Sequence, residues 1–111
     1  MTGLTDLDKE FWNRLETIFA GFDGAIIIDE HGQIVLFSEY YAKELGVSRE
    51  EVLGKNVLKY FPHTRLLEVI QTGKPIIADR WEMLGKGHIV SRIPIEYDDK
   101  IIGAVGFTVF P

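Results

Sequence analysis

The chain has 111 residues, of which 46% are hydrophobic and 26% charged, and a formal net charge of −5. This length fits one domain with one hydrophobic core. The acidic balance argues against a broad electrostatic grip on nucleic acid, because phosphate binding requires a basic surface. The sequence contains no cysteine, which excludes disulfides, thiolate nucleophiles and cysteine-ligated metal centres.

Residues 1–22 predict an amphipathic helix. Its apolar positions recur at intervals of three and four, which places them on one helical face, and they include Leu7, Phe11, Leu15 and Ile18. We expect this face either to pack on the sheet of its own domain or to form the seam of a homodimer. The sequence shows neither a signal peptide nor an apolar run of the roughly 20 residues that span a bilayer, so we expect a cytoplasmic protein.

Residues 23–46 predict a β-hairpin followed by a short helix. Two apolar runs, residues 25–28 and 34–37, flank a turn that contains Asp29 and Gly32. Glycine supplies the positive φ of a tight turn, and aspartate accepts hydrogen bonds from nearby backbone N–H groups. Ser38 is a suitable N-cap for the helix that follows.

The rest of the chain predicts brief helices and then three strands. Ser48 and Glu51 form a capping box, residues 56–61 form a short turn that Pro62 ends, and a helix follows from His63 or Thr64 to the region of Gly73. Strands are predicted over residues 76–83, 88–97 and 101–110. Five strands in two hairpin-linked groups around a helical insertion predict an α+β domain.

The layout resembles a PAS domain over essentially the whole chain from about Leu4, with the domain itself at residues 23–111, on the segments DGAIIIDEHGQIVLFSEYYAKELGVSREEVLGK and IGAVGF. A narrower resemblance rests on PHTRLLEVIQTGKP (62–75) and SRIPI (91–95), which are similar to the sensory PAS domains of bacterial sigma-54-dependent transcriptional activators. The family implies a five-stranded antiparallel sheet of order 2-1-5-4-3, short helices over one face, a small pocket between them, and signal reception or dimerisation in place of catalysis.

Some PAS domains bind flavin or heme, but the residues of this sequence support neither cofactor. Light-sensing PAS domains use a cysteine after Gly-x-Asn, whereas here Val57 follows Gly54-Lys55-Asn56, so the flavin adduct is excluded and bound flavin is not expected. Some PAS sensors ligate heme through a histidine near the position of His63. We expect His63 to be an exposed residue of the first helical turn and predict neither heme nor a metal site.

The pocket that the family implies has ten candidate residues: Phe37, Tyr41, Leu45, Val57, Phe61, Arg65, Leu66, Ile70, Arg92 and Phe107. Either arginine is able to hold a ligand carboxylate in a forked geometry. The alternative is that they form salt bridges, with Asp79, Glu82 or Glu96 as partners, or are exposed. The paired carboxylates of the chain all fall in turns or at a helix start, and we predict no catalytic site.

These observations predict a regulatory module, and its function has two interpretations. In the first, a PAS domain of a sigma-54-dependent activator binds a small cytosolic signal, forms a homodimer, or does both, and controls AAA+ and DNA-binding domains beyond residue 111. In the second, the chain is a ligand-free dimerisation module or the PAS domain of a sensor histidine kinase. Direct nucleic-acid or membrane binding by this domain is not expected.

Overall fold

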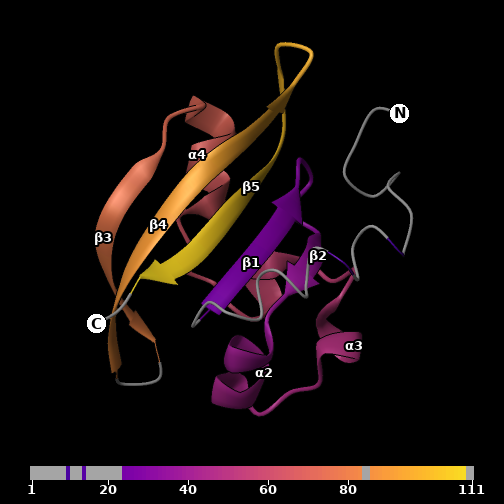
Figure 1. Ribbon diagram of the computed structural model, residues 1–111, viewed down its shortest axis with the longest axis vertical. Helices are drawn as coiled ribbons and strands as arrows, with labels where there is room; N and C mark the ends of the chain where they lie inside the picture. The colour runs from indigo at the N-terminus through magenta and orange to yellow at the C-terminus, as the bar shows by residue number, and fades with distance from the viewer. Residues whose placement is uncertain (1–9, 11–13, 15–23, 84–85, 110–111) are drawn as a thin grey trace.

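The computed structural model describes residues 10, 14, 24–83 and 86–109. Five strands form one antiparallel sheet of order β2-β1-β5-β4-β3 (Figure 1). The strands are β1 (Gly24–Asp29), β2 (Ile34–Phe37), β3 (Ile76–Met83), β4 (Lys86–Tyr97) and β5 (Lys100–Val109). This order confirms the predicted fold, and the predicted strand limits agree with the observed ones within two residues.

Four short helices connect β2 to β3, namely α2 (Glu39–Leu45), α3 (Arg49–Val52), the 3-10 helix η2 (Val57–Lys59) and α4 (Leu66–Thr72). Helix α4 contacts β4 and β5, α2 contacts β1, and α3 contacts β2. The predicted helix of residues 1–22, with Leu7, Phe11, Leu15 and Ile18, lies outside the described residues apart from Glu10 and Arg14. Both of these are helical, and they form an ion pair of 2.6 Å.

The β1–β2 hairpin forms as its sequence predicts. Oδ1 of Asp29 accepts hydrogen bonds from the backbone N–H groups of His31 and Gln33, each at 2.9 Å. Gly32 has a φ of 84°, a backbone conformation that glycine adopts without steric cost. The buried carboxylate of Asp29 is therefore satisfied by the turn that it stabilises.

The helix caps confirm one prediction and correct another. Ser48 and Glu51 form the predicted capping box at the start of α3. Ser38 occupies the N-cap position of α2, but its side chain makes no cap hydrogen bond. Its Oγ instead accepts the backbone N–H of Ala25 at 3.0 Å. The expected capping bond is replaced because β1 lies within reach, and Ser38 therefore ties α2 to the sheet.

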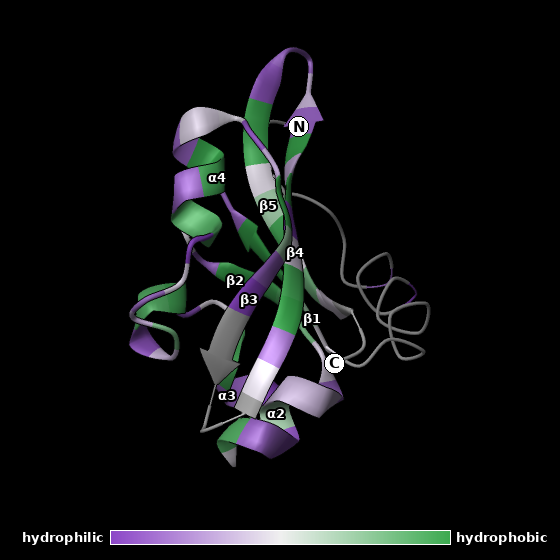
Figure 2. Cartoon of the chain, turned by 90° about the vertical axis from the view of Figure 1, so that its left-hand side faces the viewer, coloured by the Kyte–Doolittle hydropathy of each residue, from purple (hydrophilic) through white to green (hydrophobic). Residues whose placement is uncertain are grey.

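The main hydrophobic core lies between the helices and one face of the sheet. Apolar residues of α4 face the sheet while its polar residues face outward (Figure 2). The sheet contributes Ile26, Ile28, Ile34, Phe37 and Ala104, and the helices and loops contribute residues that include Tyr41, Val57, Phe61, Leu66 and Val69. A second buried cluster, Ala25, Ile27, Leu36 and Ile102, occupies the opposite face.

A β-bulge interrupts the edge strand β3. The register with β4 shifts between Ile76 and Asp79, and Ala78 within the bulge has a φ of 55°. The N–H of Ala78 donates to Oγ of the buried Ser91 at 3.0 Å. After the bulge Asp79 pairs with Val90, so its side chain lies on the helix-covered face of the sheet.

Candidate functional site

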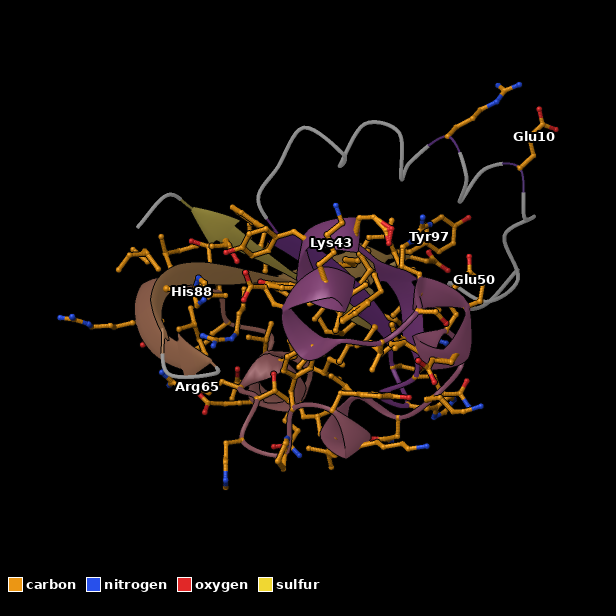
Figure 3. All side chains as sticks on the ribbon, turned by 90° about the horizontal axis from the view of Figure 1, so that it is seen from below. Glu10, Lys43, Glu50, Arg65, His88 and Tyr97 are labelled. Atoms are coloured by element: carbon orange, nitrogen blue, oxygen red, sulfur yellow. The ribbon has the colours of Figure 1, made fainter. Side chains whose placement is uncertain are left out.

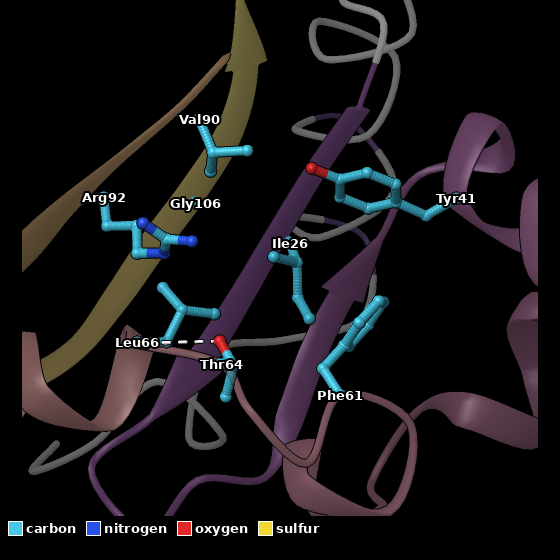
Figure 4. A pocket seen from close by; sticks show the side chains of 8 residues that line it. All are labelled: Ile26, Tyr41, Phe61, Thr64, Leu66, Val90, Arg92 and Gly106. Atoms are coloured by element: carbon cyan, nitrogen blue, oxygen red, sulfur yellow. Dashed lines mark hydrogen bonds between the residues drawn. The ribbon is translucent and has the colours of Figure 1, made fainter. Parts of the chain in front are cut away.

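A small pocket lies between the sheet and the segment that leads into α4 (Figure 4). We call it the inner pocket. Its lining residues are Ile26, Tyr41, Phe61, Thr64, Leu66, Val90, Arg92 and Gly106. Its cavity volume is about 20 Å³, which is room for about one water molecule. A larger molecule therefore requires the pocket to widen.

Two glycines of the sheet allow side chains of the inner pocket to approach the sheet backbone closely. A Cβ atom on Gly106 would lie 3.3 Å from Cδ2 of Leu66 and 3.4 Å from Cγ2 of Ile26, so the glycine lets α4 approach β5 closely. A Cβ atom on Gly24 would lie 2.5 Å from Cε1 of Tyr41, a separation that no real Cβ contact tolerates. The Tyr41 ring therefore packs directly against the backbone of β1.

The aromatic side of the inner pocket is fixed by ring contacts and one hydrogen bond. The centroids of Tyr41 and Phe61 are 6.1 Å apart, and each ring also packs on Phe37, which lies behind them. The Tyr41 hydroxyl and Oγ1 of Thr108 share a hydrogen bond of 2.6 Å. Burial raises the pKa of Tyr41, and the Thr108 hydrogen bond and the charge of Arg92 only partly offset that effect, so the phenol stays neutral and hydrogen-bonded.

The polar side of the inner pocket is a buried guanidinium. The Arg92 side chain is only 2% exposed, and its Nη1 donates to Oδ2 of Asp79 at 2.8 Å. Nη1 of Arg65 donates to the same oxygen at 3.3 Å, and Arg65 also pairs with Glu68 at 2.9 Å. One carboxylate at the pocket mouth therefore joins β3 to β4 and to the start of α4.

The charges around Asp79 decide its protonation state. Burial raises the pKa of Asp79, but the hydrogen bonds and positive charges of Arg92 and then Arg65 lower it by more, and the net pKa lies below the usual 3.8. The carboxylate is therefore ionised at neutral pH. Of the alternatives open from the sequence, the structure contains the salt bridge with Asp79 for both arginines, and Arg65 is also exposed.

Four of the ten predicted pocket residues line the inner pocket, namely Tyr41, Phe61, Leu66 and Arg92. Phe37 and Val57 are buried behind it, Leu45 and Ile70 pack against the same core, and Arg65 is exposed at its edge. Sequence reasoning missed Ile26, Thr64, Val90 and Gly106. The alternation of β4, which places Val90 on the same face as Arg92, was a signal for Val90.

The prediction that Phe107 lines the pocket is wrong. Phe107 packs against the cluster of Ala25, Ile27, Leu36 and Ile102 on the opposite face of the sheet. Successive strand residues point to opposite faces, and on β5 the pocket side belongs to Gly106. Both faces of this strand carry apolar or small residues, which left the choice of face open from the sequence.

The three histidines lie in different environments. His31 is exposed in the hairpin turn, and His63 is exposed as predicted. His63 lies in the turn before α4, which begins at Leu66, and not in the first helical turn that the sequence suggested. His88 is buried on β4, its two ring nitrogens have no hydrogen-bond partner among the residues that the structure describes, and its ring meets the Tyr40 ring edge-on at 6.4 Å. His88 and Arg65 both lie beside the β3–β4 edge, away from Lys43 on α2 (Figure 3). Within the described residues no group of three or more acidic, histidine or cysteine side chains is placed to hold a metal ion.

Comparison with known proteins identifies the family. The family model described as the PAS fold matches residues 14–80. The sequence is 31% identical over 102 residues to the sensor protein CitS of Halalkalibacterium halodurans, covering 90% of this chain and 19% of that protein. The chain belongs to the PAS family. A PAS domain is a sensory module and not itself a catalytic domain.

One further curated relative and one solved structure resemble this chain over most of its length. A probable C4-dicarboxylate sensor kinase of Halalkalibacterium halodurans is 31% identical over 83 residues, 75% of this chain and 15% of that protein. The chain thus spans less than a fifth of the length of these curated relatives. The solved PAS domain of BvgS from Bordetella pertussis superposes with a TM-score of 0.66 over 93% of this chain and 88% of that one, at 19% identity, a likeness of fold.

The described part of the chain contains no helix that is long and apolar enough to cross a membrane.

Proposed function

We propose that this chain is the sensory PAS module of a sensor histidine kinase and that it binds a small cytosolic molecule in the inner pocket. Its curated relatives are a sensor protein and probable sensor kinases several times its length, which supports a kinase that has its catalytic part elsewhere. This context replaces the sigma-54-dependent activator as the leading interpretation, because the curated relatives named here are a sensor protein and probable sensor kinases.

The single observation that carries ligand binding is the buried guanidinium of Arg92. A charged group inside an apolar pocket is costly unless it is paired. In this pocket Arg92 lies beside Ile26, Leu66 and Val90, where an aliphatic side chain would fill the same space without that cost. A polar group retained in an apolar pocket is the usual way in which small-molecule sites orient their ligands.

The position of β5 supports a route for the output. This strand is central in the sheet, pairs with β1 and β4, and contributes Gly106 to the inner pocket. A molecule that widens the pocket presses on β5 and on the start of α4. Such a molecule alters signalling only if it binds the two arrangements of the domain with different affinity.

A second candidate function is the sensory domain of a sigma-54-dependent activator. Its support is that the two sequence segments which resemble that group meet in space: Arg65 from residues 62–75 and Arg92 from residues 91–95 share Asp79. The sequence that follows residue 111 in the natural protein distinguishes the two contexts. Histidine kinase motifs there support the first, and a Walker A motif supports the second.

The test of ligand binding combines native mass spectrometry of the purified 111-residue chain with a thermal-shift screen of small neutral and acidic metabolites. We expect a co-purified mass or a saturable rise in melting temperature that the Gly106→Ala variant loses. Gly73→Ala is unsuited as a control because Gly73 has a φ of 69°; Ala25→Gly, on the opposite face, is the matched change. Absence of any bound mass and of any stabilising compound would refute the proposal.

Dimerisation is the competing role of the module. Phe11→Glu with Leu15→Glu is expected to convert a dimer into monomers in light scattering, because both residues lie on the predicted apolar face of residues 1–22. Wild-type protein that is already monomeric at high concentration removes this role.

A further inference from the structure

At the inner pocket, the Asp79 carboxylate occupies the position beside Arg92 that the carboxylate of a ligand would take. Oδ2 of Asp79 accepts from Arg92 inside the pocket and from Arg65 outside it. The side-chain exposure rises from 2% for Arg92 to 25% for Asp79 and 44% for Arg65. The carboxylate therefore reaches in from the solvent-accessible rim, and solutes are able to compete for its place.

The chemistry next to Arg92 favours one class of competitor. A guanidinium pairs with a planar carboxylate through two parallel hydrogen bonds. The neighbouring pocket surface is formed by apolar side chains of Ile26, Leu66 and Val90, which suit an apolar substituent on that carboxylate. A phosphate dianion has no apolar part to fill the pocket.

Resting on the function proposed above, we infer that the ligand is a small organic monocarboxylate that displaces Asp79 from Arg92. Its carboxylate takes over the Asp79 position, and its apolar part enters the inner pocket between Leu66 and Val90. When the ligand is absent, the Asp79 carboxylate occupies the ligand's position and forms an ion pair with Arg92.

Displacement also changes what holds the pocket closed. Arg65 is the N-cap residue of α4, and its bond to Asp79 ties the start of that helix to β3. Once the ligand occupies Arg92, the Asp79 carboxylate no longer bridges the two arginines, and residues 61–66 are released from the buried guanidinium while Arg65 keeps its exposed bond to Asp79. Since the closed pocket holds about one water molecule, this release supplies the opening that the ligand requires.

The test is chemical rescue of Asp79→Asn by added carboxylates. Thermal unfolding of wild type, Asp79→Asn and Glu68→Gln is followed in sodium acetate, propionate, phosphate and chloride at neutral pH and equal ionic strength. Glu68→Gln is the matched control, because it removes the other acidic partner of Arg65 without touching Arg92. Removal of the internal competitor is expected to strengthen the apparent binding of propionate about tenfold or more, with no such gain in Glu68→Gln.

Each other outcome overturns the inference. Equal stabilisation of all three proteins by propionate shows a general salt effect, and preference for phosphate over propionate shows the wrong class of anion. If Asp79→Asn does not fold, amide chemical shifts of the wild type decide: propionate must shift the signals of residues 64–66, 78–80 and 92, and shifts confined to other residues refute the displacement.

Two outcomes distinguish failure of the carboxylate ligand from failure of the sensory pocket itself. A neutral compound that stabilises wild type and Asp79→Asn equally, and loses its effect in Gly106→Ala, leaves a sensory pocket intact and overturns the carboxylate ligand. Failure of every neutral and acidic compound to bind any of the variants overturns both.

Discussion

The ion pair between Arg92 and Asp79 is predicted to respond asymmetrically to removal of its two partners. Asp79→Asn removes the carboxylate that accepts from Nη1 of Arg92, a guanidinium that is only 2% exposed. Loss of one partner of a fully buried pair costs about 3–5 kcal/mol, and replacement of buried charges by apolar groups of similar size is often neutral. Because Asp79 is 25% exposed and asparagine still accepts a hydrogen bond, we expect a loss of about 2 kcal/mol for Asp79→Asn.

The reciprocal variant Arg92→Met is expected to change the stability by less than about 1 kcal/mol. Methionine is flexible and fits the apolar surroundings of the pocket, and Asp79 keeps its bond to Arg65. Urea denaturation in chloride buffer at neutral pH measures both free energies of unfolding. For a domain of this size, the loss in Asp79→Asn corresponds to a fall in melting temperature of about 10 °C. An equal or larger loss in Arg92→Met would refute the reasoning, because it would show that the pair stabilises the fold as a unit.

Three other outcomes follow from the geometry. Gly24→Ala is expected to lose about 2–3 kcal/mol in urea denaturation because its methyl group would overlap the Tyr41 ring. Gly106→Ala is expected to cost less, about 1 kcal/mol, because its methyl group would meet only the ends of the Leu66 and Ile26 side chains, at 3.3 and 3.4 Å; the reverse order would contradict the close approach of Tyr41 to β1. Because the pKa of Asp79 is lower in the folded chain than its usual 3.8, its contribution to stability is present at neutral pH and is lost as the pH falls below that value, so the difference between wild type and Asp79→Asn should shrink in acid; a difference that grows there would contradict the lowered pKa. Ser48→Ala removes the capping box of α3 and is expected to cost about 1 kcal/mol by the same assay, and an unchanged midpoint would show that this short helix does not need its cap.

The local signals in the sequence were sufficient for the turns and strands. Asp29 and Gly32 predicted the first hairpin because their roles are settled within a few residues, and the observed bonds to His31 and Gln33 are all local. The capping box of Ser48 and Glu51 was predictable for the same reason. Strand order came from the family resemblance, since periodicity does not state which strands are neighbours.

The composition of the site depended on features that local patterns do not contain. The side-chain contact between Asp79 and Arg92 depends on the bulge at Ala78, which sets the register of β3 against β4. A positive φ at an alanine has no sequence signature. The Ser38 hydroxyl does not form the expected cap bond of α2 and accepts instead from the N–H of Ala25, a residue distant along the chain. Phe107 was assigned to the wrong face because β5 has apolar or small residues on both.

The bulge in β3 has a consequence for how this domain associates with others. β3 and β2 are the two outer strands of the sheet, and an unprotected outer strand invites a neighbouring molecule to extend the sheet through backbone bonding. The irregular register between Ile76 and Asp79 breaks the row of groups that such an extension needs, and β2 has only four residues. Sheet extension and fibre growth are thereby disfavoured at both borders, and self-association is directed to the surfaces formed by side chains.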